Sequence, residues 1–145
     1  MQYFEDFHVG DKTVTRARTV TEVDMVSLAA VGGNWHRLYN NIEYAKKTQF
    51  GEGIAQGMPV LSLASGHFSF ERILQRAFVA FYGVDRVRFV APTKISDTLY
   101  VGLEVVDKQD KERDGVVSSR QVVENQNGEE VVASIMKLLI GLIVN

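Results

Sequence analysis

The chain has 145 residues, of which 46% are hydrophobic and 23% charged, with a formal net charge of -2 and no cysteine. This length is typical of one domain, which we expect to span residues 1–145. Without cysteine there are no disulfides, thiolate metal ligands or catalytic thiol, and the near-neutral charge argues against a nucleic-acid partner. The first residues lack the apolar core of a signal peptide, and no apolar run is long enough to span a membrane. These features predict a cytoplasmic protein with no membrane partner.

The N-terminal part predicts a strand followed by a helix. Residues 12–20 alternate threonine, valine and arginine, a pattern that favours an exposed or edge strand. Thr21 and Asp24, three residues apart, form an approximate capping box that would start a helix. The pair Gly32 and Gly33 would end it, because glycine commonly follows the last helical turn.

A loop is expected next, over residues 34–40. Asn41 is the predicted N-cap of a short helix over 42–48. The main helix is expected over 59–76, with Pro59 in its first turn, where the missing N–H does least harm. Its apolar residues point in several directions, which predicts a buried helix.

After residue 76 the hydrophobic period changes to two, which predicts strands. We expect them over 78–90, 98–107, 116–124 and 130–144, with a two-residue hairpin turn at Asn127-Gly128. The chain therefore predicts an α+β domain in which an antiparallel sheet wraps around one long central helix.

Several segments resemble one known family in the same order along the chain. The segments read YFEDFHVGD near the N-terminus, EYAKKTQFGEGIAQGM before the main helix, and RVRFVAPTKISDTLYVGLEV across the first two strands of the meander. They are similar to the MaoC-like dehydratases, the R-specific enoyl-CoA hydratases of the hotdog fold. The resemblance implies a single hotdog domain and a hydratase or dehydratase acting on an acyl-CoA or acyl carrier protein thioester. It also implies a homodimer, or a higher homo-oligomer, built from sheets joined edge to edge. No cofactor is implied beyond the coenzyme A of the substrate.

The family's catalytic loop usually contains an aspartate and a histidine five positions apart. Aligning this chain on residues 43–45 places Asn34 at the aspartate position and Tyr39 at the histidine position. Hydration needs a base to activate water and an acid to protonate C2. Asparagine does not titrate, and a tyrosine phenol is a poor base but a possible acid. His36, three residues from Tyr39, is the nearby group that could replace the pair.

Other features of the family's site are retained at the main helix. Gly57 matches the residue whose backbone N–H polarises the thioester carbonyl, and Ser65 matches a serine that lines the pocket. Gln56 stands where the family usually has histidine. We therefore expect catalytic roles for Asn34, His36, Tyr39 and Gly57, and substrate contacts from Trp35, Gln56, Met58 and Ser65.

Each of these residues also has a structural interpretation. His36 could be a surface histidine, Asn34 could form an Asx turn, and Tyr39 could pack over the helix. Trp35 could cover the core, Gly57 could serve turn geometry, and Ser65 could allow close packing. No metal site is expected, because the three histidines have no ligand spacing.

Two other functions stay open. A non-catalytic acyl-thioester-binding or assembly subunit would explain the loss of both residues of the pair. A hotdog thioesterase would need a carboxylate near the carbonyl carbon, and Glu71 lies too late in the helix to place one convincingly. Arg86, Arg88 and Lys94 could contact coenzyme A phosphates or could form a solvated edge.

Overall fold

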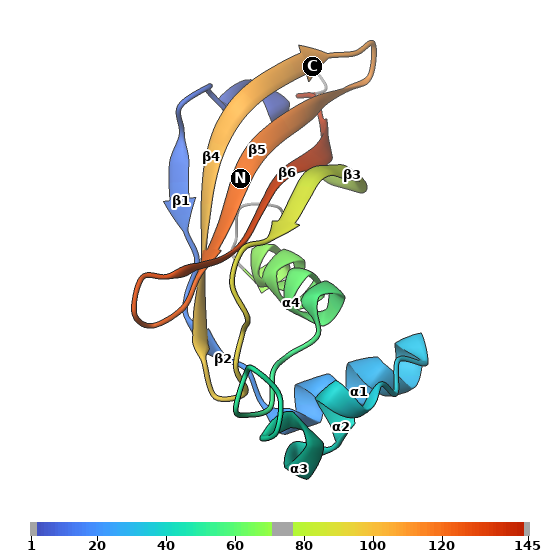
Figure 1. Ribbon diagram of the computed structural model, residues 1–145. Coiled ribbons are helices and arrows are strands. Elements are labelled where there is room, and N and C mark those ends of the chain that lie inside the picture. The colour runs from blue at the N-terminus through green and yellow to red at the C-terminus, as the bar shows by residue number, and fades with distance from the viewer. Residues whose placement is uncertain (1–2, 71–76, 144–145) are drawn as a thin grey trace.

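The computed structural model describes residues 3–70 and 77–143, with the side chains of residues 67–70 outside that description. The elements are labelled in Figure 1. In chain order they are η1 (Phe4–Asp6), β1 (Lys12–Val14), β2 (Arg18–Thr19), α1 (Glu22–Gly32), α2 (Arg37–Asn40), α3 (Ile42–Ala45), α4 (Gly57–Phe70), β3 (Phe78–Phe89), β4 (Thr98–Asp110), β5 (Asp114–Glu124) and β6 (Glu130–Gly141).

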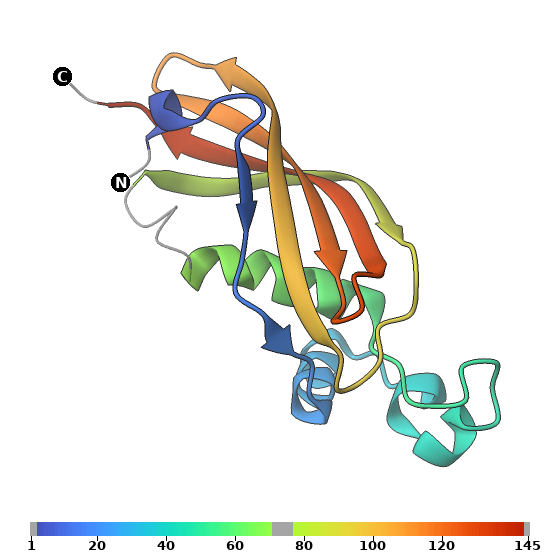
Figure 2. The same cartoon turned by 90° about the vertical axis from the view of Figure 1, so that its left-hand side faces the viewer.

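An antiparallel sheet in the order β1-β4-β5-β6-β3 forms the body of the molecule, and β2 pairs with β4 beside this path. The sheet curves around α4, while α1, α2 and α3 gather beyond one end of the sheet (Figures 1 and 2). The predicted arrangement, an antiparallel sheet around one long helix, is confirmed. Strands β1 and β3 are the two end strands of this path.

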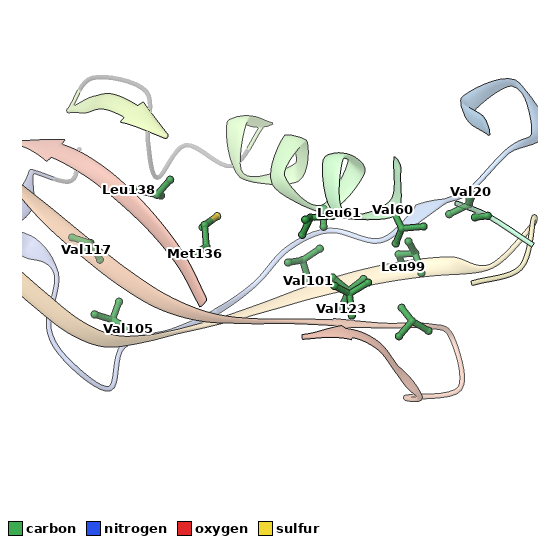
Figure 3. Close-up of a cluster of buried hydrophobic side chains, with 14 of the residues drawn as sticks. Val20, Val60, Leu61, Leu99, Val101, Val105, Val117, Val123, Met136 and Leu138 are labelled. Carbon is green, nitrogen blue, oxygen red and sulfur yellow. The ribbon is translucent and has the colours of Figure 1, made fainter. Parts of the chain in front are cut away.

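The core lies between α4 and the concave face of the sheet. Figure 3 shows Val60 and Leu61 of α4 facing Val101, with Leu99 and Val123 beside it. All five side chains are at most 8% exposed. Burying an aliphatic side chain of this size contributes about 1.5–3 kcal/mol, so this contact holds the first half of α4 against the sheet.

Helix α4 differs from its prediction at its start and in its burial. It begins at Gly57 instead of Pro59, and the Val60 N–H donates to the Gln56 carbonyl oxygen at 3.2 Å. It is not buried on every side, because Met58 is 66% exposed and Ser62 is exposed as well. The sheet covers one face of α4 and leaves the other face open. The predicted end of this helix, at residue 76, lies outside the described residues.

The strand predicted over 12–20 is wrong as a single element, because the chain divides into β1 and β2. Between them, the Thr15 N–H donates to the Val101 carbonyl oxygen at 2.9 Å, and the Thr15 hydroxyl accepts the Val101 N–H at 3.2 Å. The side chain thus replaces a regular ladder bond. The capping box predicted at Thr21 and Asp24 is confirmed, as is the end of α1 at Gly33, which has a left-handed φ of 68°.

The loop predicted over 34–40 contains a helix, α2, because His36 supplies a cap that the residue pattern did not predict. Its Nδ1 accepts the Leu38 N–H at 3.2 Å. Asn41 is the N-cap of α3, as predicted, and its side chain accepts the Tyr44 N–H at 2.9 Å. Helix α3 ends at Ala45, earlier than expected.

The hairpin predicted at Asn127-Gly128 exists, but its loop is longer than two residues. The Asn125 N–H donates to the Glu129 carbonyl oxygen at 2.9 Å, which encloses three residues, and Gly128 has a φ of 72°. The Asn125 side chain accepts the N–H groups of Asn127 and Glu129 at 2.9 and 3.1 Å. Because the buried Asn125 amide organises the turn, the loop contains three residues, one more than the predicted two-residue turn.

Within residues 3–70 and 77–143, no helix combines the length and apolar character needed to cross a membrane. The same residues contain no cluster of three or more histidine, aspartate or glutamate side chains suited to hold a metal ion.

Candidate functional site

A cavity of about 540 Å³ opens where the start of α4 meets the end of β3 and the loop before α2. This is the usual size range of small-molecule sites. Its polar lining residues are Asn34, Tyr39, Gln56 and Thr93. Its apolar lining residues include Phe50, Met58, Phe89, Val90 and Val132.

Gln56 joins the loop to the helix start. Its side chain is only 4% exposed, and its Nε2 donates to the Asn34 carbonyl oxygen at 3.2 Å. Asn34 itself is exposed, and its Oδ1 lies 3.5 Å from the His36 nitrogen, a long contact of the Asx-turn type. Asn34 therefore contributes both a backbone anchor and a side-chain amide to the cavity wall.

Gly57 places a backbone donor at this wall. The first N–H groups of a helix have no intrahelical acceptor, and in the described part of the chain the Gly57 N–H has no other acceptor. Such a donor can bind a carbonyl oxygen or a developing negative charge. The ring of Phe89 lies so close to Gly57 that a Cβ at this position would be 2.8 Å from the nearest ring carbon.

Tyr39 is half-buried and lines this cavity. It also borders a second cavity of about 410 Å³ between α1, α2 and α3, and so contacts both spaces. Among the described residues that line the first cavity, Tyr39 alone has a titratable side chain. It is therefore the group there that can give up and take back a proton.

His36 lies outside the described lining of the first cavity, and its side chain is exposed. Its ring centroid is 6.1 Å from that of Tyr39, at an interplanar angle of 63°. Because Nδ1 accepts the Leu38 N–H, a neutral His36 carries its proton on Nε2. In this tautomer Nε2 is a donor, so His36 would have to give up its cap before Nδ1 could act as a base.

The remaining expected contacts lie elsewhere. Trp35 is 56% exposed and borders the second cavity. The Ser65 hydroxyl donates to the Ser62 carbonyl oxygen of its own helix at 3.0 Å. Neither Trp35 nor Ser65 lines the first cavity. The structure therefore brings Asn34, Tyr39, Gln56, Gly57 and Met58 together and leaves Trp35, His36 and Ser65 outside that group.

Sequence reasoning missed the wall contributed by the end of β3. Phe89, Val90 and Thr93 line the cavity, and the Thr93 carbonyl oxygen accepts the Ala55 N–H at 2.7 Å. Pro92 was the available signal, because it ends the strand and turns the chain toward the helix start. Nothing in the local pattern, however, showed which helix this strand end would meet.

The basic residues near the end of β3 are not part of the cavity lining. Lys94 pairs with Glu52 at 2.6 Å, and this hydrogen-bonded carboxylate raises the pKa of Lys94. Arg88 donates to the neighbouring Val87 carbonyl oxygen at 2.8 Å, and Arg86 has a left-handed φ of 52°. Glu71 lies outside the described residues.

Residues 6–127 match the family model described as a MaoC-like domain. Protein MaoC of Klebsiella aerogenes is 34% identical over 102 residues, which are 70% of this chain but only 30% of that protein. A structure described as a monoamine oxidase regulatory protein from Archaeoglobus fulgidus is 40% identical, with a TM-score of 0.90 over 99% of this chain and 96% of that one.

A second solved structure is the unliganded R-hydratase PhaJ1 from Pseudomonas aeruginosa. It is 28% identical, with a TM-score of 0.80 over 97% of this chain and 86% of that chain. The sheet wrapped around α4 is the hotdog arrangement. The chain therefore belongs to the MaoC-like domain family and has the hotdog fold of its hydratase and dehydratase members.

Proposed function

We propose that the protein adds water to, or removes it from, the C2–C3 bond of an enoyl thioester carried by coenzyme A or acyl carrier protein. The observation that carries this proposal is the shared wall of Asn34, Tyr39 and Gly57 in one cavity. These residues occupy the positions that the family resemblance gives to its catalytic pair and its carbonyl-binding amide.

The residues suggest a division of labour. The Gly57 N–H holds the thioester oxygen and stabilises the enolate that forms when water attacks C3. The Asn34 side chain orients the attacking water by hydrogen bonds but takes no proton. As the water attacks C3, the Tyr39 hydroxyl gives its proton to C2, and the phenolate that remains takes the proton that the water loses, so the protein ends the cycle unchanged. No cofactor takes part beyond the carrier of the substrate.

Tyr39 is a better candidate for the proton transfer than His36, because only Tyr39 lines the cavity. His36 could still act after its cap is released, which makes the two assignments experimentally separable. The test measures the loss of enoyl absorbance of crotonyl-CoA in the presence of the wild-type protein, the Tyr39→Phe variant or the His36→Ala variant. Tyr100→Phe is the matched control, because it removes an exposed phenol that does not line the cavity.

We expect Tyr39→Phe to lose about 10²-fold or more in rate, the usual contribution of a general acid–base group. The Tyr100 variant should match the wild type. If His36→Ala loses activity and Tyr39→Phe keeps it, the proton transfer belongs to His36. If the wild-type protein turns over no enoyl thioester of any chain length, the hydratase proposal is refuted.

A non-catalytic acyl-thioester-binding or assembly subunit is the second candidate. It is favoured by one observation: the described residues that line the cavity include neither a carboxylate nor an imidazole. Binding of acyl-CoA in calorimetry without turnover would establish it. The same lining disfavours a thioesterase, which would release a free thiol from acyl-CoA.

The end strand β3 supports a homodimer. Phe78, Val79, Phe81 and Tyr82 are each 43–54% exposed along this strand. An apolar end strand that stays unpaired is an aggregation hazard, and pairing with a second copy would remove it. Sedimentation at micromolar concentration should show a dimer that Val79→Lys weakens. A wild-type monomer would refute this part of the proposal.

A further inference from the structure

Phe89 holds an unusual position at the candidate site. It is the last residue of β3, pairs with Val132 of β6, and its side chain is 49% exposed. The next residue is fixed as well, because the Val90 N–H donates to the Val131 carbonyl oxygen at 2.9 Å. The backbone that carries the ring is therefore anchored to the sheet.

The ring itself rests on the first residue of α4. Three of its carbons would lie 2.8, 2.9 and 2.9 Å from a Cβ at Gly57. Optimal separations between carbon atoms are about 3.5–4.0 Å, so only a glycine at this position lets the ring lie where it does. The contact joins the carbonyl-binding donor to the apolar wall of the cavity.

A carbonyl oxygen bound to the Gly57 N–H would lie about 2.9 Å from its nitrogen. Gly57 and Phe89 line the same cavity, so the ring would border the space taken by the atoms attached to the carbonyl carbon. One of these atoms is C2. With only hydrogen on C2 the acyl chain would fit beside the ring, whereas a methyl group on C2 would compete with the ring for the same space.

We propose that Phe89 is a specificity-determining residue that admits acyl thioesters unsubstituted at C2 and excludes those with a C2 methyl branch. The proposal rests on the proposed function, because it takes the Gly57 N–H as the carbonyl-binding donor. Discrimination by one methyl group in an apolar pocket is typically about tenfold or more.

The test is binding, so that it does not depend on turnover. The affinities of butyryl-CoA and 2-methylbutyryl-CoA are measured by calorimetry on the wild-type protein, Phe89→Ala and the milder Phe89→Leu. Phe81→Ala is the matched control. It removes an equally exposed phenylalanine from the same strand, 47% exposed, that does not line the cavity. Sedimentation of each variant reports any change of oligomeric state.

The wild-type protein should bind butyryl-CoA about tenfold or more tightly than its C2-methyl analogue. Both Phe89 variants should bring this ratio close to one, and Phe81→Ala should leave it unchanged. An equal ratio in the wild-type and Phe89 proteins overturns the specificity role but leaves the proposed function intact. If the wild-type protein binds neither thioester, the proposed function falls, and this inference falls with it.

Discussion

Replacing Gly57 by alanine tests the contact on which the specificity proposal depends. The new Cβ would lie 2.8 Å from the nearest Phe89 ring carbon, so the ring has to move. The substitution keeps the backbone N–H, which is the proposed carbonyl-binding donor. The effect on stability therefore does not include the loss of a hydrogen bond.

Two terms of opposite sign determine the change in the free energy of unfolding. Alanine is favoured over glycine inside a helix by about 0.5–1 kcal/mol, because it has less conformational entropy to lose. Overpacking against an existing side chain costs about 1–3 kcal/mol. The cost should lie at the low end here, because Phe89 is 49% exposed and can swing outward. We expect Gly57→Ala to be destabilising by at most about 2 kcal/mol.

The double-mutant cycle with Phe89→Ala separates the two terms. Without the ring, Gly57→Ala should stabilise the protein by about 0.5–1 kcal/mol, which gives a coupling energy of about 1–3 kcal/mol. Urea unfolding of the four proteins measures it. If alanine at 57 stabilises both backgrounds equally, the ring does not rest on Gly57 and the reasoning is refuted.

Gly115→Ala is an internal comparison for this cycle. A Cβ at Gly115 would meet the ring of Phe4 even more closely. Phe4 is only 6% exposed and has no open space to enter. The cost of Gly115→Ala should therefore exceed that of Gly57→Ala, toward the upper part of the overpacking range of about 1–3 kcal/mol.

Three further predictions concern stability. Burial raises the pKa of Asp24, but hydrogen bonds from Thr21 and Arg18 outweigh this effect and lower the pKa below the ordinary value of 3.8. The ionised Asp24 carboxylate therefore stabilises the fold above about pH 4, and this stabilisation is lost as the pH falls through the lowered pKa. Asp24→Asn should cost about 1 kcal/mol at pH 7 and less near pH 2, and an equal cost at both pH values in urea unfolding would contradict this. Asn125→Ala should cost about 1–3 kcal/mol in the same assay, because it leaves turn N–H groups without their acceptor; an unchanged midpoint would count against the Asx geometry. Gln121 is 1% exposed, and its Nε2 has no hydrogen-bond partner among the residues that the structure describes, while its Oε1 accepts the Ser134 hydroxyl at 2.8 Å. Replacing the pair by methionine and alanine should therefore leave the melting temperature unchanged or raise it, and a clear drop would show that the polar pair is stabilising.

Much of the fold could be predicted because its signals are local. The capping box at Thr21 and Asp24 and the N-cap at Asn41 need only neighbouring residues, and both were found where expected. The alternation of the later strands likewise reflects one buried face of a sheet. The errors arose where a side chain replaced a backbone partner, as with Thr15 between β1 and β2 and His36 at the start of α2.

The site could be predicted only in part, because its two walls come from distant parts of the chain. Asn34 and Gly57 are 23 positions apart, and the bond from Gln56 to the Asn34 carbonyl oxygen brings them together. The resemblance to the family supplied these positions. Phe89 follows Gly57 by 32 residues, and its contact with the helix start depends on the path of β3 past α4. A long-range packing contact of this kind leaves no periodic signal in the sequence.

The loop also allows the family's catalytic pair to be rebuilt. Asn34 and Tyr39 keep the spacing of five that the family uses for aspartate and histidine, and both line the same cavity. Asn34→Asp together with Tyr39→His would place a carboxylate and an imidazole on that wall. Because hydration needs an acid and a base together, either change alone should gain less than the double variant.

We expect the double variant to hydrate crotonyl-CoA about 10²-fold faster than the wild-type protein, the lower end of what acid–base catalysis contributes. Asn40→Asp is the control, since it adds an equal charge on the exposed side of α2, outside the cavity lining. Measuring acyl-CoA affinity alongside the rate keeps binding and chemistry apart. If affinity is kept and the rate does not rise, the wall around Asn34 and Tyr39 no longer holds the geometry that a water molecule and C2 require. Evolution of this chain would then have changed the shape of the loop as well as its two side chains, and the binding subunit would become the better account of the cavity.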